Sequence, residues 1–185
     1  MTERLPPPNP DALTADQETA IKVFGLARGC PPFGPFSTML HSPELMLRAS
    51  ALGEYLRYRT QLGPRLSELA ILITARFWDQ PVEWQIHHPI ALEAGVSRST
   101  IEAIAAGQPP SGLTPDEQAL YDFCIELQRD RKVCDATYAA ALAVFGEKGV
   151  LDLAGICGYY TLLAMAMNVA GTPPSEDGPA LARLT

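Results

Sequence analysis

Residues 64–78, PRLSELAILITARFW, and residues 81–96, PVEWQIHHPIALEAGV, decide the fold of this 185-residue chain. The first segment is apolar on almost every side of a helix, which is typical of a helix buried in a protein core. Pro64 and Pro81 each suit the first turn of a helix, and Gly95 is a common helix stop. We therefore predict two consecutive helices joined by a short turn, the first of them buried.

Glu83 and His87 are the most informative residues of the second segment. Because they lie four positions apart, both side chains project from one face of a helix. A carboxylate beside an imidazole orients the tautomer of the ring and raises its pKa, which suits proton transfer. Glu68 lies within the apolar first segment, where an acid is costly unless it is paired. These three residues are the candidate catalytic group.

The rest of the chain carries helix signals and no useful run of alternating apolar and polar residues, so the predicted fold class is all-α. Thr14, Ser97 and Thr114 are good N-caps for helices. Further helices are predicted at residues 13–29, 43–62, 98–107, 113–132, 134–146 and 150–171. Residues 30–43, CPPFGPFSTMLHSP, have too much proline and glycine for regular structure. We expect a long loop there whose apolar side chains cover a core or line a pocket.

The length favours one domain, which we place at residues 13–171, between a proline-rich segment at 1–12 and a C-terminal tail at 172–185. The formal net charge of −7 argues against nucleic acid as a partner, because phosphate contacts need a basic surface. Residues 150–171 are strongly apolar, but Asp152, Asn168 and the lack of a basic flank favour a buried or interface helix over a membrane span. The N-terminus lacks the apolar stretch of a signal peptide, so we expect a cytoplasmic protein.

Four cysteines are present, and none forms a C-x-x-C pair: Cys30, Cys124, Cys134 and Cys157. Their wide spacing indicates neither a zinc site nor a disulfide framework, so we interpret them as reduced thiols that act as small hydrophobes. A metal site built on Glu83, His87 and His41 would have too few certain ligands, and no metal is predicted. A helix-turn-helix at residues 94–107 is disfavoured by the acidic charge and by its single arginine, Arg98.

Three segments resemble the carboxymuconolactone decarboxylase family, which includes the alkylhydroperoxidase D-like proteins: RLSELAIL at 65–72, VEWQIHHPIALEAGVS at 82–97, and a late helix with Gly-Tyr-Tyr at 158–160. The resemblance runs from about residue 34 to residue 171. In the peroxidase branch of that family the second helix carries C-x-x-C-x-x-x-H, and a glutamate lies on the helix before it. Here Gln80 and Glu83 stand at the two cysteine positions, while Glu68 and His87 match the glutamate and the histidine.

The resemblance implies an alkylhydroperoxidase D-like helical bundle that assembles into trimers or hexamers, with a pocket near a subunit contact and no bound cofactor. A thiol peroxidase needs one thiolate to attack peroxide and a second thiol to resolve the sulfenic acid. The replacements at positions 80 and 83 therefore disfavour peroxidase chemistry. The resemblance instead favours a lyase-like enzyme that performs decarboxylation, isomerisation or lactone chemistry on a small organic acid.

In this interpretation His87 donates or accepts the proton, Glu83 holds the imidazole tautomer or binds substrate, and Glu68 supports the charge. The other expected pocket-lining residues are Gln80, Trp84, Phe36 and Met39. Arg65 or Arg76 could anchor a substrate carboxylate, and the sequence places neither in the pocket. Three alternatives stay open. His87 could be a structural histidine, the fold could gather two cysteines into a thiol peroxidase, or the protein could bind a small molecule without turnover.

Overall fold

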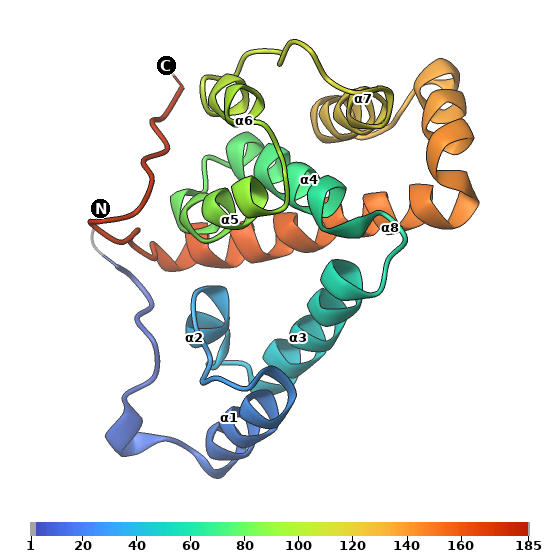
Figure 1. The fold of residues 1–185 in the computed structure, drawn as a ribbon. Coiled ribbons are helices and arrows are strands. Elements are labelled where there is room, and N and C mark those ends of the chain that lie inside the picture. The colour runs from blue at the N-terminus through green and yellow to red at the C-terminus, as the bar shows by residue number, and fades with distance from the viewer. Residues whose placement is uncertain (1–2, 185) are drawn as a thin grey trace.

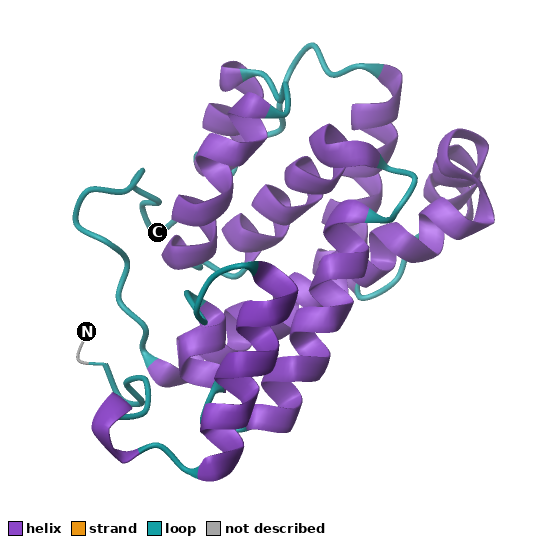
Figure 2. Ribbon diagram, turned by 60° about the horizontal axis from the view of Figure 1, so that its bottom comes forward, coloured by secondary structure: helices purple, strands orange, loops and turns teal. Residues whose placement is uncertain are grey.

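The computed structural model describes residues 3–184, and within that range it contains helices and no strand, which confirms the all-α fold class (Figure 1, Figure 2). A short 3-10 helix, η1, precedes eight α-helices in the described range. Their bounds are η1 Pro10–Ala12, α1 Ala15–Arg28, α2 Pro35–Met39, α3 Pro43–Tyr58, α4 Gly63–Phe77, α5 Pro81–Glu93, α6 Arg98–Ala105, α7 Pro115–Asp130 and α8 Asp135–Ala170.

The long helix α8 crosses the molecule, with α4 to α7 on one side and α1 to α3 on the other (Figure 1). Gly146 interrupts it with φ 65° and ψ 175°, a conformation that glycine adopts readily because it has no Cβ. The predicted helices at 134–146 and 150–171 therefore correspond to two helical stretches on either side of this break. By length and composition α8 could cross a membrane, and 56% of its most apolar window is buried inside the fold.

Helix α4 lies at the centre of the core, as its sequence predicts. Every residue from Leu66 to Arg76 is buried, and the α4 side chains pack in one cluster with apolar residues of α3, α7 and α8. The start of α4 is fixed by Arg65, which forms ion pairs with Asp116 and Glu117 at the start of α7. Arg65 therefore ties two helices together, away from the predicted site.

The predicted loop at residues 30–43 is wrong for its middle part, because residues 35–39 form the short helix α2. Pro35 occupies the first turn, where its missing N–H is not needed. Phe36 and Met39 are 5% exposed, so burial of these side chains stabilises a helix that is too short to form alone. The local signal for a loop was thus overridden by packing against the core.

The three predicted N-caps are confirmed where the structure gives their contacts. Thr14 and Thr114 form capping boxes with Gln17 and Glu117, and Ser97 accepts a hydrogen bond from the backbone N–H of Thr100. The residues after α8 fold back over α5. The side chain of Gln85 exchanges two hydrogen bonds of 2.8 and 2.9 Å with the backbone of Ser175.

Candidate active site

The structure brings the three predicted catalytic residues together at the contact between α4 and α5. Glu68 comes from α4, and Glu83 and His87 come from the inward face of α5. All three are at most 4% exposed. The side chain of Gln80 accepts a hydrogen bond from the backbone N–H of Val82, and this N-cap fixes where α5 begins. The catalytic role of the three residues stays a prediction.

The contact between Glu68 and His87 decides the tautomer of the imidazole. His87 Nδ1 lies 2.6 Å from Glu68 Oε2. Since an ionised carboxylate can only accept, Nδ1 carries the hydrogen and donates it to Glu68. The other ring nitrogen, Nε2, then faces Glu83 Oε2 at 3.5 Å as an acceptor. The order Glu68, His87, Glu83 is therefore a chain along which a proton can move.

The carboxyl group of Glu83 is suited to hold a proton near neutral pH. Burial raises its pKa to about 7 from an ordinary value of 4.5, while the charges of His87 and Arg57 work in the opposite direction. Its Oε1 atom is buried and has no hydrogen-bond partner among residues 3–184. This combination of an intermediate pKa and a free oxygen is common among groups that transfer protons.

Arg57 is a site residue that the sequence did not predict. It comes from α3, and its terminal nitrogen donates a hydrogen bond of 3.1 Å to Glu68 Oε1. This ion pair compensates the buried charge of Glu68. In the sequence Arg57 is one of several arginines in a helix with an ordinary exposed face, and no spacing distinguishes it from Arg48 or Arg59.

A small cavity adjoins Glu83 and His87. Its volume is about 30 Å³, which is room for one or two water molecules. Aromatic side chains make up much of its wall: Phe33, Phe36, Tyr159 and Tyr160. The ring of Tyr160 stands edge-on to His87, with centroids 5.1 Å apart and planes at 89°. Burial raises the pKa of Tyr160 well above its ordinary value, so its hydroxyl is neutral at physiological pH.

The other predicted pocket residues lie in different places. Phe36 lines the cavity, as does Arg28 from α1. Trp84, Met39 and Gln80 are buried but are not part of its wall. Trp84 packs in the core with its ring near that of His88, and Gln80 serves as the N-cap of α5.

His41 does not line the cavity beside His87, and its ring nitrogen contacts the backbone oxygen of Pro6 at 2.8 Å. Among residues 3–184 no group of three His, Cys, Asp or Glu side chains is arranged to hold a metal ion.

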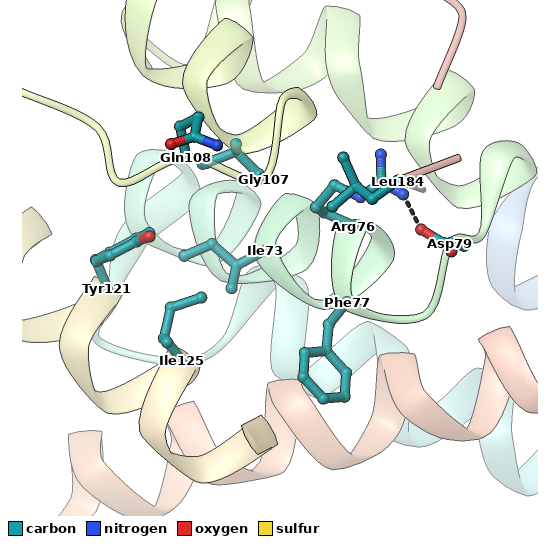
Figure 3. A pocket seen from close by; sticks show the side chains of 10 residues that line it. Ile73, Arg76, Phe77, Asp79, Gly107, Gln108, Tyr121, Ile125 and Leu184 are labelled. Atoms are coloured by element: carbon teal, nitrogen blue, oxygen red, sulfur yellow. Dashed lines mark ion pairs between the residues drawn. The ribbon is translucent and has the colours of Figure 1, made fainter. Parts of the chain in front are cut away.

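A second, larger cavity of about 290 Å³ lies between α4, α6, α7 and the C-terminal tail (Figure 3). Ile73, Tyr121, Ile125 and Leu184 give it a largely apolar wall. Arg76 also lines it, forms an ion pair with Asp79, and donates to the backbone oxygens of residues 105 and 182. The cavity shares no lining residue with the site around His87. Arg76, like Arg65, is therefore not available to a substrate there.

The fold brings two of the four cysteines together. The sulfur atoms of Cys124 and Cys157 lie 3.5 Å apart where α7 packs on α8. Both residues are buried, and burial raises the pKa of Cys124 well above its ordinary value. Neither lines the cavity beside His87. These features describe thiols that pack as apolar groups.

Residues 43–124 match the sequence profile of the carboxymuconolactone decarboxylase family. The matched range includes α3, α4 and α5, which together carry Arg57, Glu68, Glu83 and His87. Among curated proteins no sequence matches this chain.

Several solved structures share the fold. One is the alkylhydroperoxidase AhpD core of an uncharacterized peroxidase-related protein from Ralstonia eutropha, with a TM-score of 0.75 and 21% identity over 95% of this chain and 93% of that one. The debrominase Bmp8 in complex with 2,3,4-tribromopyrrole has a TM-score of 0.73 at 15% identity, over 95% and 94% of the two chains. A protein of unknown function from Agrobacterium tumefaciens has a TM-score of 0.68 at 16% identity, over 75% and 96%. At these identities the likeness shows the helical fold.

Proposed function

We propose that the chain, whose residues 43–124 match the carboxymuconolactone decarboxylase family, is an enzyme that performs acid/base chemistry on a small organic acid, lactone or carbonyl compound. The observation that carries the proposal is the buried row of side chains Glu68, His87 and Glu83. At one end His87 Nδ1 lies 2.6 Å from Glu68 Oε2, and at the other end Glu83 Oε1 has no hydrogen-bond partner among the described residues. Proton transfer by these side chains requires no cofactor.

Each of the three residues would have a different role in proton transfer, set by its surroundings. Glu68 is paired with Arg57 and stabilises positive charge on the imidazole when His87 takes a proton. The protonated carboxyl of Glu83 is the group that delivers a proton to the substrate, and Glu83 is then left as a carboxylate. His87 Nε2 takes up a proton from water and passes it to Glu83, which restores the starting state. In a decarboxylation, the bond to the departing carbon dioxide breaks and its electron pair enters a carbonyl or conjugated system. Glu83 then protonates the carbon that remains.

The substitution His87→Gln tests this proposal, and His88→Gln is its matched control. Glutamine keeps hydrogen-bonding capacity but cannot carry a proton near neutral pH. A panel of lactones, β-keto acids and unsaturated acids identifies a substrate first. We then expect His87→Gln to lower kcat by roughly 10²–10⁴-fold, the usual contribution of a general acid or base. His88→Gln should stay near the wild-type rate, since His88 lies next to Trp84 outside the cavity wall.

A near wild-type rate for the folded His87→Gln protein would exclude the histidine from the reaction. Binding of panel compounds without any turnover would instead support the alternative of a small-molecule binding protein.

A thiol peroxidase is the second candidate, and the approach of Cys124 to Cys157 is the observation that favours it. Two features oppose it: both thiols are buried, and the raised pKa of Cys124 disfavours the reactive thiolate. Peroxide consumption with lipoyl or thioredoxin-type donors decides the matter. We expect background rates, unchanged by Cys157→Ser. Efficient turnover that this substitution abolishes would establish the peroxidase.

A further inference from the structure

Two residues that line one cavity each carry a buried polar atom without a hydrogen-bond partner among the described residues. Among the described residues, four buried side-chain nitrogen or oxygen atoms have neither a hydrogen-bond partner nor an ion-pair partner: Arg57 Nε, Ser67 Oγ, Arg76 Nε and Glu83 Oε1. Arg57 and Glu83 both line the small cavity beside His87. The first offers a donor and the second a carboxyl oxygen. Buried polar groups are normally satisfied, so a pair left open in a candidate site points to a ligand that completes it.

We propose that Arg57 binds the anionic group of the substrate, and that the substrate is a small planar carboxylate whose conjugated body lies between the aromatic walls of the cavity. The proposal rests on the proposed function for the reaction, but the binding site it describes is separable from the chemistry. Arg57 uses one terminal nitrogen for Glu68, which holds the guanidinium plane in place. Its Nε–H is then free to donate to a carboxylate oxygen, a contact that arginine geometry favours.

The charges around the cavity favour an anion. Arg28 and Arg57 both line it, whereas Glu68 is already engaged by Arg57 and His87. Glu83 is the acid among the described residues that line the cavity, and it can take up a proton when an anion arrives beside it. A carboxylate can therefore enter without leaving two unpaired negative charges in contact.

The body of the ligand is constrained by the aromatic side chains. Phe33 and Phe36 line the cavity and form an edge-on pair with centroids 6.0 Å apart. Tyr159 and Tyr160 also line it and form a second edge-on pair. Flat, unsaturated groups pack well against such rings. Because the cavity of about 30 Å³ holds only water, a ligand must displace part of this wall. Phe33, which is 41% exposed, is the outermost part of it.

Calorimetric titration of the full chain with trans-cinnamate and with the neutral cinnamamide tests the anion site at pH 6. For the wild type we expect cinnamate to bind at least tenfold more tightly than the amide. Arg57→Gln should remove that preference, and Arg57→Lys should keep part of it, because the charge stays while the planar donor is lost. Arg48→Gln is the matched control from the same helix, since Arg48 is exposed and forms an ion pair with Glu44 outside the cavity. It should bind like the wild type.

A measurement on the wild type keeps the test independent of variant folding, because removal of Arg57 leaves Glu68 without its cation. The Nε–H resonance of Arg57 should shift when cinnamate is added and stay in place with cinnamamide. The proposal would be overturned if cinnamate fails to bind the wild type. It would also be overturned if folded Arg57→Gln protein binds cinnamate as tightly as the wild type does. Arg57-dependent binding without His87-dependent turnover would remove only the proposed reaction. Turnover that needs His87 but not Arg57 would remove only the anion site.

Discussion

Glu83 makes the stability of the protein depend on pH. Its pKa is raised to about 7 in the folded protein by burial, from an ordinary value of 4.5. Between these values the unfolded chain releases the proton first, so the contribution of Glu83 to stability is highest below about pH 4.5, falls as the pH rises, and levels off above about pH 7. The expected loss from this residue is on the order of 3 kcal/mol.

Urea unfolding between pH 4.5 and 8 measures this loss, with Glu83→Gln as the comparison. The amide does not ionise, so the free energy of unfolding of the variant, relative to that of the wild type, should increase as the pH rises and then stay constant. Parallel pH profiles for the two proteins would contradict the assignment of the raised pKa to Glu83.

Single residues of the site were predictable to different degrees. Glu83 and His87 lie four apart on one helix, and local sequence carries that relation directly. Glu68 was suggested by an acid in an apolar helix, but its 2.6 Å contact depends on how two helices pack. Arg57 reaches the site from a third helix, and the spacing of neighbouring residues in the sequence does not indicate how that helix packs. Trp84 follows Glu83 directly, so its side chain points about 100° away around the helix, into the core.

At the scale of elements, α2 depends on the backbone freedom of the residue before it. Gly34 has φ 53° and ψ −128°, a region that residues with a Cβ rarely adopt, and an added Cβ would lie 3.1 Å from Ile86. We expect Gly34→Ala to cost roughly 1–3 kcal/mol through backbone strain, lowering Tm by several degrees. Gly112→Ala is the control, since Gly112 also has a positive φ of 72° but open space around it.

Differential scanning calorimetry of both variants gives the comparison. The Gly34 variant should lose more than the Gly112 variant, and it should also weaken ligand binding, because α2 carries Phe36 into the cavity wall. A smaller loss for Gly34→Ala than for Gly112→Ala would contradict this account of how α2 begins.

Most elements could be predicted because their signals are local. The caps at Thr14 and Thr114 and the buried stripe of α4 are properties of a few neighbouring residues. Helix α2 could not be predicted, since five residues with proline and glycine before them read as a loop. Its helical form depends on core contacts made by residues distant in sequence, which no short pattern contains.

At the scale of the whole molecule, α8 has an apolar face that nothing in the described chain covers. Leu151, Leu162, Met165 and Val169 are exposed, with Leu151 at 74% and Val169 at 70%. Together with Gly158 they follow each other at intervals of seven, four, three and four residues, the spacing of a helix seam that packs on another helix. We propose that a second copy of the chain covers this face and that the protein is a homo-oligomer, with a trimer or hexamer expected from the family resemblance.

Sedimentation of Leu162→Glu tests this assembly. A charge in the middle of the seam should shift the protein to monomers at micromolar concentration, because an unpaired carboxylate is costly inside an apolar interface. Leu26→Glu is the control, since Leu26 on α1 is 89% exposed and lies outside the seam. A wild-type monomer, or equal effects of the two substitutions, would refute the α8 interface.

Because the cavity beside His87 holds no more than one or two waters, a hydrogen removed from a substrate there would meet few exchange partners before it returned. In heavy water an isomerisation would therefore leave most of the product unlabelled, since the same hydrogen would move from one carbon to another. A decarboxylation would instead add one deuterium, because the proton on Glu83 equilibrates with solvent between turnovers. The mass of the product would thus reveal the reaction type, because the small cavity leaves few waters with which the hydrogen could exchange.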